Sequence, residues 1–394
     1  MSAQLTESLR EYYSVIFPAQ QIVNWLNYKD DDDVDVFRNR EFSMTLPGEI
    51  YIRYLAFEDH YDLKKELVRK IPIKIDVGAV YNASPRAHKS MPIYDFRPVQ
   101  HELVFDIDIS DYNDVRTCCQ ESNICQKCWP FMAIGAKVLN TILTKEFGFK
   151  HLLFVFSGRR GFHCWVCDKE ARYLTNEARR AIADYFALIK GGENLVRRVE
   201  IDTKSGLHPL IIKSLDVIDE HFEDLMVHKQ DFLSNEHLIQ NVIDLLPPLA
   251  TTDEKNPDQH FKNSLFQCKM RKSSSADLWD FIKRSANQHK RNKTRYYLEE
   301  VKLHHCFPRL DTNVTRGMNH LLKLPFCIHP KTGNVCVPLD IETIDKFQLD
   351  QVPNIKDLQE FNTFNQSLEP YFNIMKKFCS NLEKSSKRKD SLDF

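Results

Sequence analysis

The chain has no long apolar run. None of its 394 residues belongs to a stretch approaching the run of about 18 uncharged apolar residues that a membrane-spanning helix needs. The first ten residues carry Glu7 and Arg10 and have no apolar core, so they do not form a secretory signal. Hydrophobic residues make up 42% and charged residues 28%, a balance typical of globular proteins. We therefore expect an intracellular protein with no membrane partner.

The chain also lacks an excess of positive charge. Its 54 basic and 55 acidic residues give a net charge of −1. A protein that binds nucleic acid through charge alone is usually strongly basic. Any contact with nucleic acid must therefore be local, short or shared with a partner.

The spacing of apolar residues predicts a mixed α+β architecture. Three- and four-residue spacings predict helices over residues 9–17, 22–28, 131–147 and 368–378. Apolar, β-branched and aromatic runs predict strands over residues 41–46, 50–56, 73–81, 103–109, 152–157 and 162–167. Pro47-Gly48 marks a turn, and the acidic run Asp30–Asp33 is interpreted as a solvated loop.

The chain changes character after its first β-rich part. Residues 177–299 are charged and helical by pattern, with a linker-like break over 247–263, so we interpret them as an inserted helical subdomain. The expected core then comprises residues 1–176 and 300–383. The polar tail, 384–394, is expected to be disordered.

Two aspartates alternate with apolar residues in the strand Val104–Ser110. Phe105 and Ile107 face the core in this register, and Asp106 and Asp108 project from the other face, with Cα atoms roughly 6.5 to 7 Å apart. Carboxylates held that close repel unless a cation lies between them. Mg²⁺ and Mn²⁺ prefer oxygen ligands and link carboxylates to phosphates. The pattern indicates a divalent-metal site.

Two other interpretations compete for this strand. The pair could be two solvated aspartates at a strand end. A haloacid dehalogenase-type phosphatase also places D-x-D after an apolar strand, with the first aspartate as nucleophile. That fold expects a doubly wound sheet and a distant acidic pair, whereas here a cysteine cluster follows at once, so this interpretation ranks well behind.

A basic turn separates two apolar strands at residues 157–163. Arg159 and Arg160, flanked by glycines, present forked donors that match phosphate oxygens. Ser157 and His163 add a hydroxyl and an imidazole within seven residues. An Arg-Arg turn is otherwise often only surface charge. The nearby hydroxyl and imidazole favour phosphate binding by this turn.

A second polar set follows near the C-terminal part of the expected core. Asp311 could add a third carboxylate to the metal site if the fold brings it beside Asp106. His320 and Lys323 are three residues apart and share a face if that stretch is helical. The alternative makes Lys323 a surface charge and His329 a loop residue, and spacing alone does not decide.

Four cysteines lie within eleven residues, at positions 118, 119, 125 and 128. Four thiolates bind Zn²⁺ in closed structural sites, and the Cys125–Cys128 spacing is that of a zinc knuckle. An iron–sulfur cluster is the competitor. We predict structural zinc held by Cys118, Cys119, Cys125 and Cys128, and we assign Cys164 and Cys167 to the core, because residues three apart in a strand face opposite sides.

Together these motifs resemble the small subunit of eukaryotic DNA primases, in the archaeo-eukaryotic primase superfamily. In order and spacing the resemblance covers nearly the whole chain except the helical insertion and the termini. The motifs are Arg40-Glu41-Phe42, Tyr51-Ile52-Arg53-Tyr54, Phe105-Asp106-Ile107-Asp108, the cysteine knuckle, Ser157 to His163, Pro308 to Asp311, and His329 to Gly333. It implies a primase-type core of mixed sheets flanked by helices, with the helical insertion and the zinc knuckle.

The resemblance also implies roles for individual residues. Asp106, Asp108 and Asp311 bind catalytic Mg²⁺ or Mn²⁺, with Glu41 nearby. The triphosphate of the incoming nucleotide is held by Ser157, Arg159, Arg160, His163, Lys323 and His329, with residues from His320 to Lys323 lining that pocket. Tyr51, Arg53 and Asp76 complete the nucleotide pocket, with Asp76 placed to accept from a ribose 2′-hydroxyl.

The implied activity is synthesis of short RNA primers on single-stranded DNA from ribonucleoside triphosphates, by two-metal nucleotidyl transfer at the initiation of replication. The implied partners are a large subunit with an iron–sulfur domain and the catalytic and accessory subunits of DNA polymerase alpha, in the nucleus. Two alternatives remain: a primase-polymerase that uses deoxynucleotides in repair or damage tolerance, and a non-catalytic zinc scaffold that binds single-stranded DNA. An intact carboxylate trio argues against the scaffold.

Overall fold

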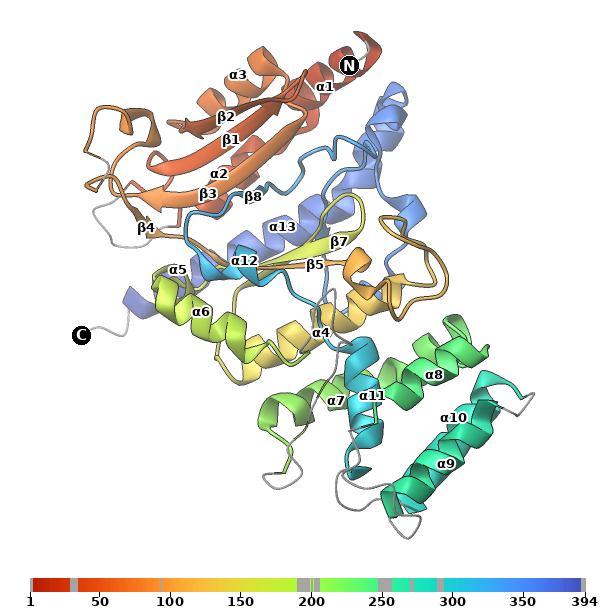
Figure 1. Ribbon diagram of the computed structural model, residues 1–394. Helices are drawn as coiled ribbons and strands as arrows, with labels where there is room; N and C mark the ends of the chain where they lie inside the picture. Colours follow the sequence, from red (N-terminus) through yellow and green to blue (C-terminus); the bar gives the residue numbers. More distant parts are fainter. Residues whose placement is uncertain are drawn as a thin grey trace. The chain divides into compact units, whose positions relative to one another are not determined.

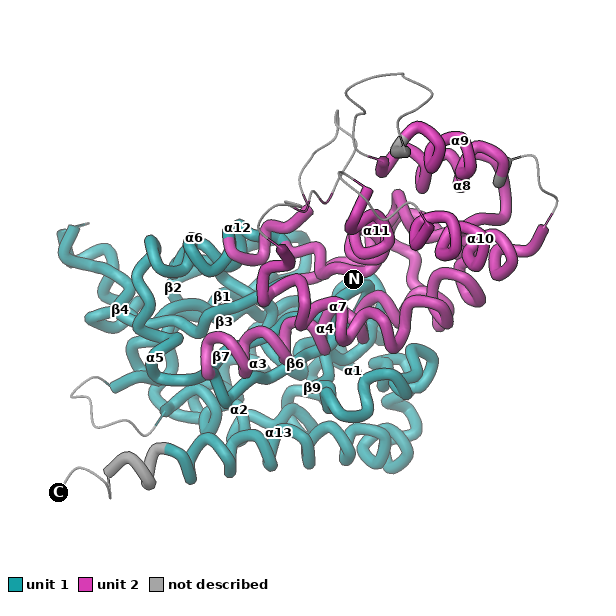
Figure 2. Tube along the Cα trace, turned by 90° about the horizontal axis from the view of Figure 1, so that it is seen from below, with its two compact units in different colours: residues 1–106, 149–184, 311–394 teal, residues 107–148, 185–310 magenta. Residues whose placement is uncertain are grey.

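The computed structural model describes residues 3–28, 35–92, 94–189, 199, 201, 206–246, 257–269, 273–288 and 294–390. The chain divides into two compact units (Figure 2). Unit 1 comprises residues 1–106, 149–184 and 311–394, and unit 2 comprises residues 107–148 and 185–310. Each unit is therefore built from segments that are far apart in the sequence.

The first sheet of unit 1 has the strand order β2-β1-β3-β4, and β8 also pairs with β3. Figure 1 shows β2, β1 and β3 side by side. The strands are β1 (Arg40–Leu46), β2 (Ile50–Leu55), β3 (Lys74–Tyr81), β4 (Pro98–Gln100) and β8 (Leu322–Lys323). All the pairs in this sheet are antiparallel. β8 therefore places a segment from the C-terminal part of the sequence beside the central strand β3.

The second sheet has the strand order β5-β7-β6-β9. Its strands are β5 (Leu103–Asp108), β6 (Leu152–Phe156), β7 (Gly161–Val166) and β9 (Pro338–Leu339). β7 is buried along its whole length, and β6 is buried except at its first residue, because both are continuous apolar runs. Cys164 and Cys167 are fully buried, which confirms their assignment to the core.

Helices complete unit 1. They are α1 (Ala3–Glu11), α2 (Ala19–Leu26), α3 (His60–Lys70), α5 (Lys169–Arg172), α6 (Asn176–Tyr185, whose last residue falls in unit 2), α12 (Thr312–Arg316) and α13 (Phe361–Asp390). The long helix α13 packs against α2 and β9. None of the helices in the described part of the chain could span a bilayer.

A buried ion pair ties the first sheet to the start of β5. Arg40 and Glu102 have fully buried side chains and form two hydrogen bonds, of 2.9 and 3.0 Å. Tyr28 donates a third bond to Glu102 at 2.6 Å. Although burial alone raises it, the pKa of Glu102 is lowered to about 2, with Arg40 as the largest favourable influence. The pair holds the strand that carries the neighbouring residue Glu41 in a fixed place.

Unit 2 is helical in its described part. Its helices are α4 (Trp129–Lys145), α7 (Pro209–Phe222), α8 (Glu236–Asp244), α9 (Pro257–Lys269), α10 (Ser275–Gln288) and α11 (Tyr297–Cys306). α4 is apolar on most of its surface, and it packs against α7 and α11. A helix that is apolar nearly all round is stable only inside a core, and α4 is the central helix of this unit.

The α+β class and the positions of the predicted strands are confirmed. The predicted helix over 131–147 is α4, and the predicted helix over 368–378 lies within α13. α13 continues to Asp390 and so includes the first residues of the tail that we expected to be disordered. The division into units differs from the sequence-based boundaries, because α4 and the cysteine-rich segment join the helical unit. Residues 30–33 lie outside the described residues, as does most of the linker-like break over 247–263.

Candidate functional site

Asp106 and Asp108 occupy the C-terminal end of β5. Phe105, Ile107 and Ile109 are fully buried, while both aspartates are partly exposed, as the alternation along the strand predicts. Asp108 is the last residue of β5, and its side chain caps the turn that follows. Its Oδ1 accepts hydrogen bonds from the backbone N–H of Ser110 at 2.9 Å and from the Ser110 hydroxyl at 2.7 Å. These bonds fix the orientation of the second carboxylate.

Asp311 lies beside this strand although it is some 200 residues later in the chain. Its backbone N–H donates to the carbonyl oxygen of Asp106 at 3.1 Å within unit 1. Leu310 pairs with Ile107 in an antiparallel bridge within unit 2. The Asp311 side chain is exposed and caps α12 by accepting from Asn313 N–H at 3.0 Å. The fold thus brings a third carboxylate residue next to Asp106.

The turn from β6 to β7 requires glycine at position 158. Gly158 has φ of +85°, and a Cβ added there would lie 2.7 Å from the Cβ of His329. The carbonyl oxygen of Gly158 accepts from the Thr332 hydroxyl at 2.7 Å. This close approach places the Arg159–Arg160 turn against the segment that carries His329.

Positive charge converges on this turn. Lys323 donates from Nζ to the carbonyl oxygen of Ser157 at 3.1 Å. Burial, followed by the charges of Lys323, Arg159, Lys331 and Arg160, lowers the pKa of His329 to about 3. A neutral imidazole surrounded by fixed cations is an environment that attracts a polyanion. The predicted basic residues are therefore neighbours in space.

His163 connects the basic groups to the carboxylates. Its side chain is 8% exposed, and its Nε2 lies 3.8 Å from Oδ1 of Asp106. Burial, then the charges of Lys323 and Lys74, lowers the pKa of His163 to about 3, so this imidazole is neutral near pH 7. Burial also lowers the pKa of His320, although the charges of Asp311 and Asp76 act in the opposite direction.

Asp76 lies in the middle of the first sheet with one unsatisfied oxygen. Its Oδ2 accepts from the Ser43 hydroxyl at 3.2 Å and pairs with Lys74 Nζ at 2.9 Å. Its Oδ1 is buried and has no hydrogen-bond partner. Lys323 is its direct cross-strand neighbour, through the pairing of β3 with β8. A buried, unpaired carboxylate oxygen is costly unless a donor from a ligand completes it.

Glu41 is only 1% exposed and has both of its oxygens engaged. Arg53 donates to it from Nε at 3.0 Å and from a terminal nitrogen at 3.2 Å, and Tyr81 donates its hydroxyl at 3.2 Å. The pairing favours a role for Glu41 in orienting Arg53.

Tyr51 lies on the edge strand β2 and is 51% exposed. Arg316, the last residue of α12, pairs with Asp184 at 2.6 Å.

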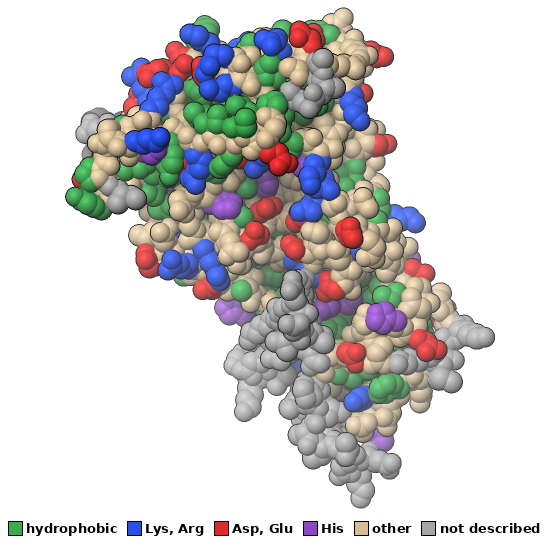
Figure 3. Space-filling model, turned by 45° about the horizontal axis from the view of Figure 1, so that its top comes forward, with side chains coloured by type: hydrophobic (Ala, Val, Ile, Leu, Met, Phe, Trp, Pro, Cys, Tyr) green, Lys and Arg blue, Asp and Glu red, His purple; other side chains and the backbone are tan. Residues whose placement is uncertain are grey.

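Among the residues that the structure describes, one group of three or more potential metal ligands has all its ligand atoms within 4.8 Å of one another. That group is the four cysteines. The carboxylates of Asp106, Asp108 and Asp311 are not gathered this closely, so their role as metal ligands stays a prediction. On the face shown in Figure 3, Lys and Arg side chains lie among Asp and Glu side chains, in keeping with the net charge of −1.

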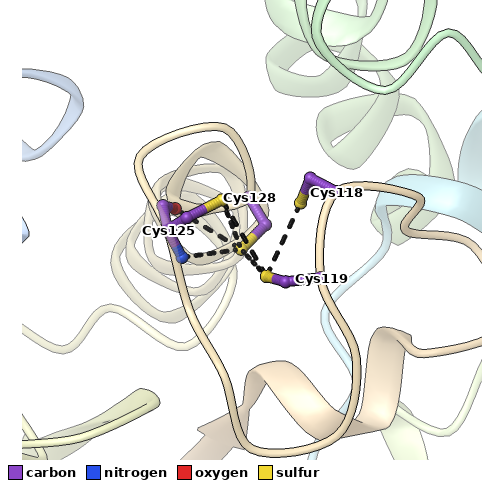
Figure 4. Close-up of side chains that lie close together, drawn as sticks. All are labelled: Cys118, Cys119, Cys125 and Cys128. Atoms are coloured by element: carbon purple, nitrogen blue, oxygen red, sulfur yellow. Dashed lines mark hydrogen bonds between the residues drawn. The ribbon is translucent and has the colours of Figure 1, made fainter.

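The sulfur atoms of the four cysteines point toward one another from the loop that precedes α4 (Figure 4). The Sγ–Sγ distances are 3.8 Å for Cys118–Cys119, 3.9 Å for Cys119–Cys125, 3.6 Å for Cys119–Cys128 and 3.8 Å for Cys125–Cys128. A tetrahedron with metal–sulfur bonds of about 2.3 Å has sulfur–sulfur edges of roughly 3.8 Å. The four thiols therefore fit one tetrahedral ion such as Zn²⁺. An iron–sulfur cluster fits less well, because its thiolates bind different irons and lie farther apart.

Two residues that the sequence analysis missed support this cluster. Arg116 is 3% exposed, and its Nη1 lies 3.5 Å from the sulfur of Cys119 and 3.9 Å from that of Cys128. Gln230, from the helical part of unit 2, donates to the sulfur of Cys118 at 3.5 Å and to the carbonyl oxygen of Lys127 at 2.9 Å. Cations and N–H donors near thiolate sulfurs stabilise their negative charge.

The position of Arg116, two residues before the cysteine pair, was a signal available in the sequence. Gln230 lies 112 residues from Cys118 and carried none. The same is true of Ser43, whose bond to Asp76 depends on the pairing of β1 with β3. Lys74 could have been found, because it lies two residues before Asp76 and so on the same face of β3.

Comparisons with known proteins agree with one another. A family model described as DNA primase small subunit matches residues 105–341. A protein of that name from Schizosaccharomyces pombe is 39% identical over 371 residues, which cover 92% of this chain and 79% of that protein. The Drosophila melanogaster protein of that name is 38% identical, with 93% and 84% covered. The Saccharomyces cerevisiae protein of that name is 35% identical, with 96% and 92% covered.

Proposed function

This chain belongs to the DNA primase small subunit family, and from that premise we propose that it synthesises short RNA primers on single-stranded DNA from ribonucleoside triphosphates. As a primase small subunit it is an enzyme of DNA replication. The observation that carries the proposal is the neighbourhood, within unit 1, of Asp106 and Asp311 with the basic groups around His163 and His329. Acidic metal ligands and a cationic phosphate cradle are the two parts that nucleotidyl transfer needs.

Asp106, Asp108 and Asp311 would hold Mg²⁺ or Mn²⁺, because carboxylate oxygens are the ligands these ions prefer. When bound, such an ion lowers the pKa of the attacking 3′-hydroxyl and neutralises charge that builds on the α-phosphate. His163, 3.8 Å from Asp106, is neutral and so donates a hydrogen bond to phosphate without competing for the metal site by charge. The protein thus acts mainly through position and electrostatics.

The triphosphate would lie along the β6–β7 turn. Arg159 and Arg160 offer forked donors, and Lys323 is held over the carbonyl oxygen of Ser157. Gly158 and the pairing of β8 with β3 already hold this part of the site in place, so binding of the triphosphate should cost little conformational entropy. The neutral His329 completes the cradle.

Asp76 supports selection of ribonucleotides. Its buried Oδ1 has no partner, and a ribose 2′-hydroxyl is a donor of the kind it lacks. A deoxynucleotide leaves that oxygen unpaired. We therefore expect Asp76→Ala to weaken ribonucleotide incorporation more than deoxynucleotide incorporation, measured as kcat/KM for each. Equal losses would favour a primase-polymerase that accepts both sugars.

The four cysteines would hold structural zinc, since the cluster leaves no ligand position open for chemistry. With a net charge of −1 the chain has a weak general attraction for DNA. It therefore works in a complex: a large subunit with an iron–sulfur domain and the subunits of DNA polymerase alpha supply further template contacts, in the nucleus.

The test is direct. The purified chain is incubated with a polypyrimidine single strand, the matching purine ribonucleotide and Mn²⁺, and short RNA products are measured. Asp106→Ala and Asp108→Ala should abolish the products while the circular dichroism spectrum stays unchanged. Asp350→Ala, an exposed aspartate outside the site, is the control. Products that survive the first two substitutions would remove these carboxylates from the mechanism.

A further inference from the structure

A cavity of about 570 Å³ lies in unit 1 next to the proposed nucleotide site. Four aromatic rings contribute to its wall in two stacked pairs. Tyr54 and His88 stack with centroids 4.0 Å apart, and Tyr81 and Phe96 stack at 4.2 Å with nearly parallel planes. A cavity of this size suits a ligand of nucleoside dimensions, within the range of about 300–1,000 Å³ typical of small-molecule sites.

The backbone of β2 is strained where it supplies this wall. Tyr54 has φ of +57°, a conformation that a residue with a side chain rarely adopts. The register of β1 against β2 shifts at the same point, so Arg53 and Tyr54 form a bulge. Glu41 holds the strained residue by accepting its N–H at 3.3 Å. Bulges and strained residues collect beside functional sites, where they turn a side chain to a new direction.

The loop that supplies the two partner rings, His88 and Phe96, is held in place before any ligand arrives. His88 Nδ1 lies 2.9 Å from the carbonyl oxygen of Pro85, which fixes the orientation of the ring. The loop that carries His88 and Phe96 is closed at its base by Asn82, which bonds to Asp95 at 2.7 Å and to Arg97 at 3.1 Å. A rigid aromatic wall binds a flat ligand with little loss of conformational entropy.

Polar groups complete the cavity. Lys89 brings a cation, and Asn176 and Asn319 bring two amides. The Tyr81 hydroxyl in the wall donates to Glu41 at 3.2 Å, which connects the cavity to the Glu41–Arg53 pair. Asn319 precedes His320, the residue predicted to line the triphosphate pocket. Aromatic faces, amides that pair with base edges and one cation for a phosphate are the groups that recognise an unstacked base.

We propose that this cavity binds one unpaired base of the single-stranded template, outside the position being copied. The inference rests on the proposed function, because it names where the template contacts the same unit. The base of the incoming nucleotide is the other candidate, and its chemistry argues against it. That base must keep its pairing edge free for the template, whereas a base that lies against these rings with the two amides at its edge would have that edge occupied.

The experiment measures binding of the full chain to a fluorescein-labelled polypyrimidine 12-mer by fluorescence anisotropy, at one low salt concentration. His88→Ala should raise Kd at least about fivefold, the lower end of the loss for one base stack. His88→Phe, which keeps a flat ring, should bind nearly as well as the wild type. The control is His60→Ala, because His60 also packs against a tyrosine ring, that of Tyr61 with centroids 3.8 Å apart, but outside the cavity.

Strands with one abasic position make the test independent of protein folding. One position should cost the wild type at least about fivefold in affinity, and His88→Ala should lose nothing more at that position. Equal Kd values for wild type and His88→Ala, or an abasic series with no sensitive position, would overturn the proposal. Free uridine monophosphate is added as a competitor. If it displaces the labelled strand from the wild type but not from His88→Ala, the cavity is a mononucleotide site and the proposal is overturned.

The outcomes separate this inference from the proposed function. Asp106→Ala should stop primer synthesis and leave the Kd for the 12-mer unchanged. If His88→Ala binds normally while Asp106→Ala is inactive, only the base pocket fails. If Asp106→Ala still makes primers, the catalytic assignment fails whatever the binding data show.

Discussion

The four cysteines of unit 2 lie within eleven residues of chain, whereas the basic groups of unit 1 come from the turn that begins at Ser157 and from Lys323, which is 166 residues later. The cysteine cluster is organised locally, and its four thiols fit a single tetrahedral ion. The proposed nucleotide site is organised by strand pairing, by Gly158 and by the bond from Asp311 to β5.

The comparison teaches that the two sites should fail in different ways. Loss of the ion should loosen the cysteine loop and leave the sheets of unit 1 intact. Damage to the packing around Gly158 should disturb the nucleotide site and leave the metal in place. Four changes test this contrast.

Metal removal should have the largest effect. Structural zinc contributes roughly 10–16 kcal/mol of apparent binding energy in small zinc peptides, so a strong chelator or Cys128→Ala should cost the knuckle several kcal/mol. Hydrogen exchange should rise across residues 107–128 and stay unchanged across β1 and β3. Cys164→Ala, which removes a buried thiol from unit 1, should lower stability without changing bound metal. Full metal content in Cys128→Ala would contradict the assignment.

Gly158→Ala should lower the free energy of unfolding by about 3 kcal/mol. A left-handed conformation costs a residue with a side chain roughly 1–2 kcal/mol, and the new Cβ, 2.7 Å from His329, adds overpacking of roughly 1–3 kcal/mol. Gly48→Ala is the matched control, because its φ is +80° and nothing lies within 4 Å of the added Cβ. Urea unfolding should show a smaller loss there. Equal losses in the two variants would show that His329 can move away from the added Cβ at no cost in stability.

Acid should destabilise unit 1 through His163. Its pKa in the folded protein, about 3, is below the ordinary value of 6.5, so between these pH values the unfolded chain binds a proton at His163 and the folded chain does not. This stability is fully present above pH 6.5 and is lost as pH falls toward 3, by about 2 kcal/mol at pH 5. His163→Gln should flatten that slope in denaturation curves measured from pH 7 to 5. A His163 ring signal that titrates near pH 6.5 by NMR would refute this.

Arg116→Gln should have the smallest of the four effects. Loss of the cation beside the thiolates should weaken zinc binding at least about tenfold, as measured by competition with a chromogenic chelator. Arg38→Gln, at an exposed arginine that pairs with Asp35, should leave zinc affinity unchanged. Unchanged affinity in Arg116→Gln would mean that the metal site needs no charge compensation from this side chain.

Much of the fold could be read from periodicity. The alternation of Asp106 and Asp108 with buried residues, the strands around the Arg159–Arg160 turn and the apolar helix α4 all appear where their patterns predict them. These features depend on residues a few positions apart, so the sequence carries the signal directly. The boundary drawn at residue 176 used chain order, which does not report packing, whereas the structure groups α4 with the helical unit.

By itself the sequence determined the strand that bears the aspartates, the four-cysteine knuckle and the turn with two arginines, because each is a local pattern of residue types. Only the tertiary structure decided that Lys323 faces Asp76, that Gln230 reaches Cys118, and that Tyr54 is turned by a bulge into an aromatic cavity. Those contacts join residues far apart in the chain. They arise from strand register and packing, which no single segment encodes.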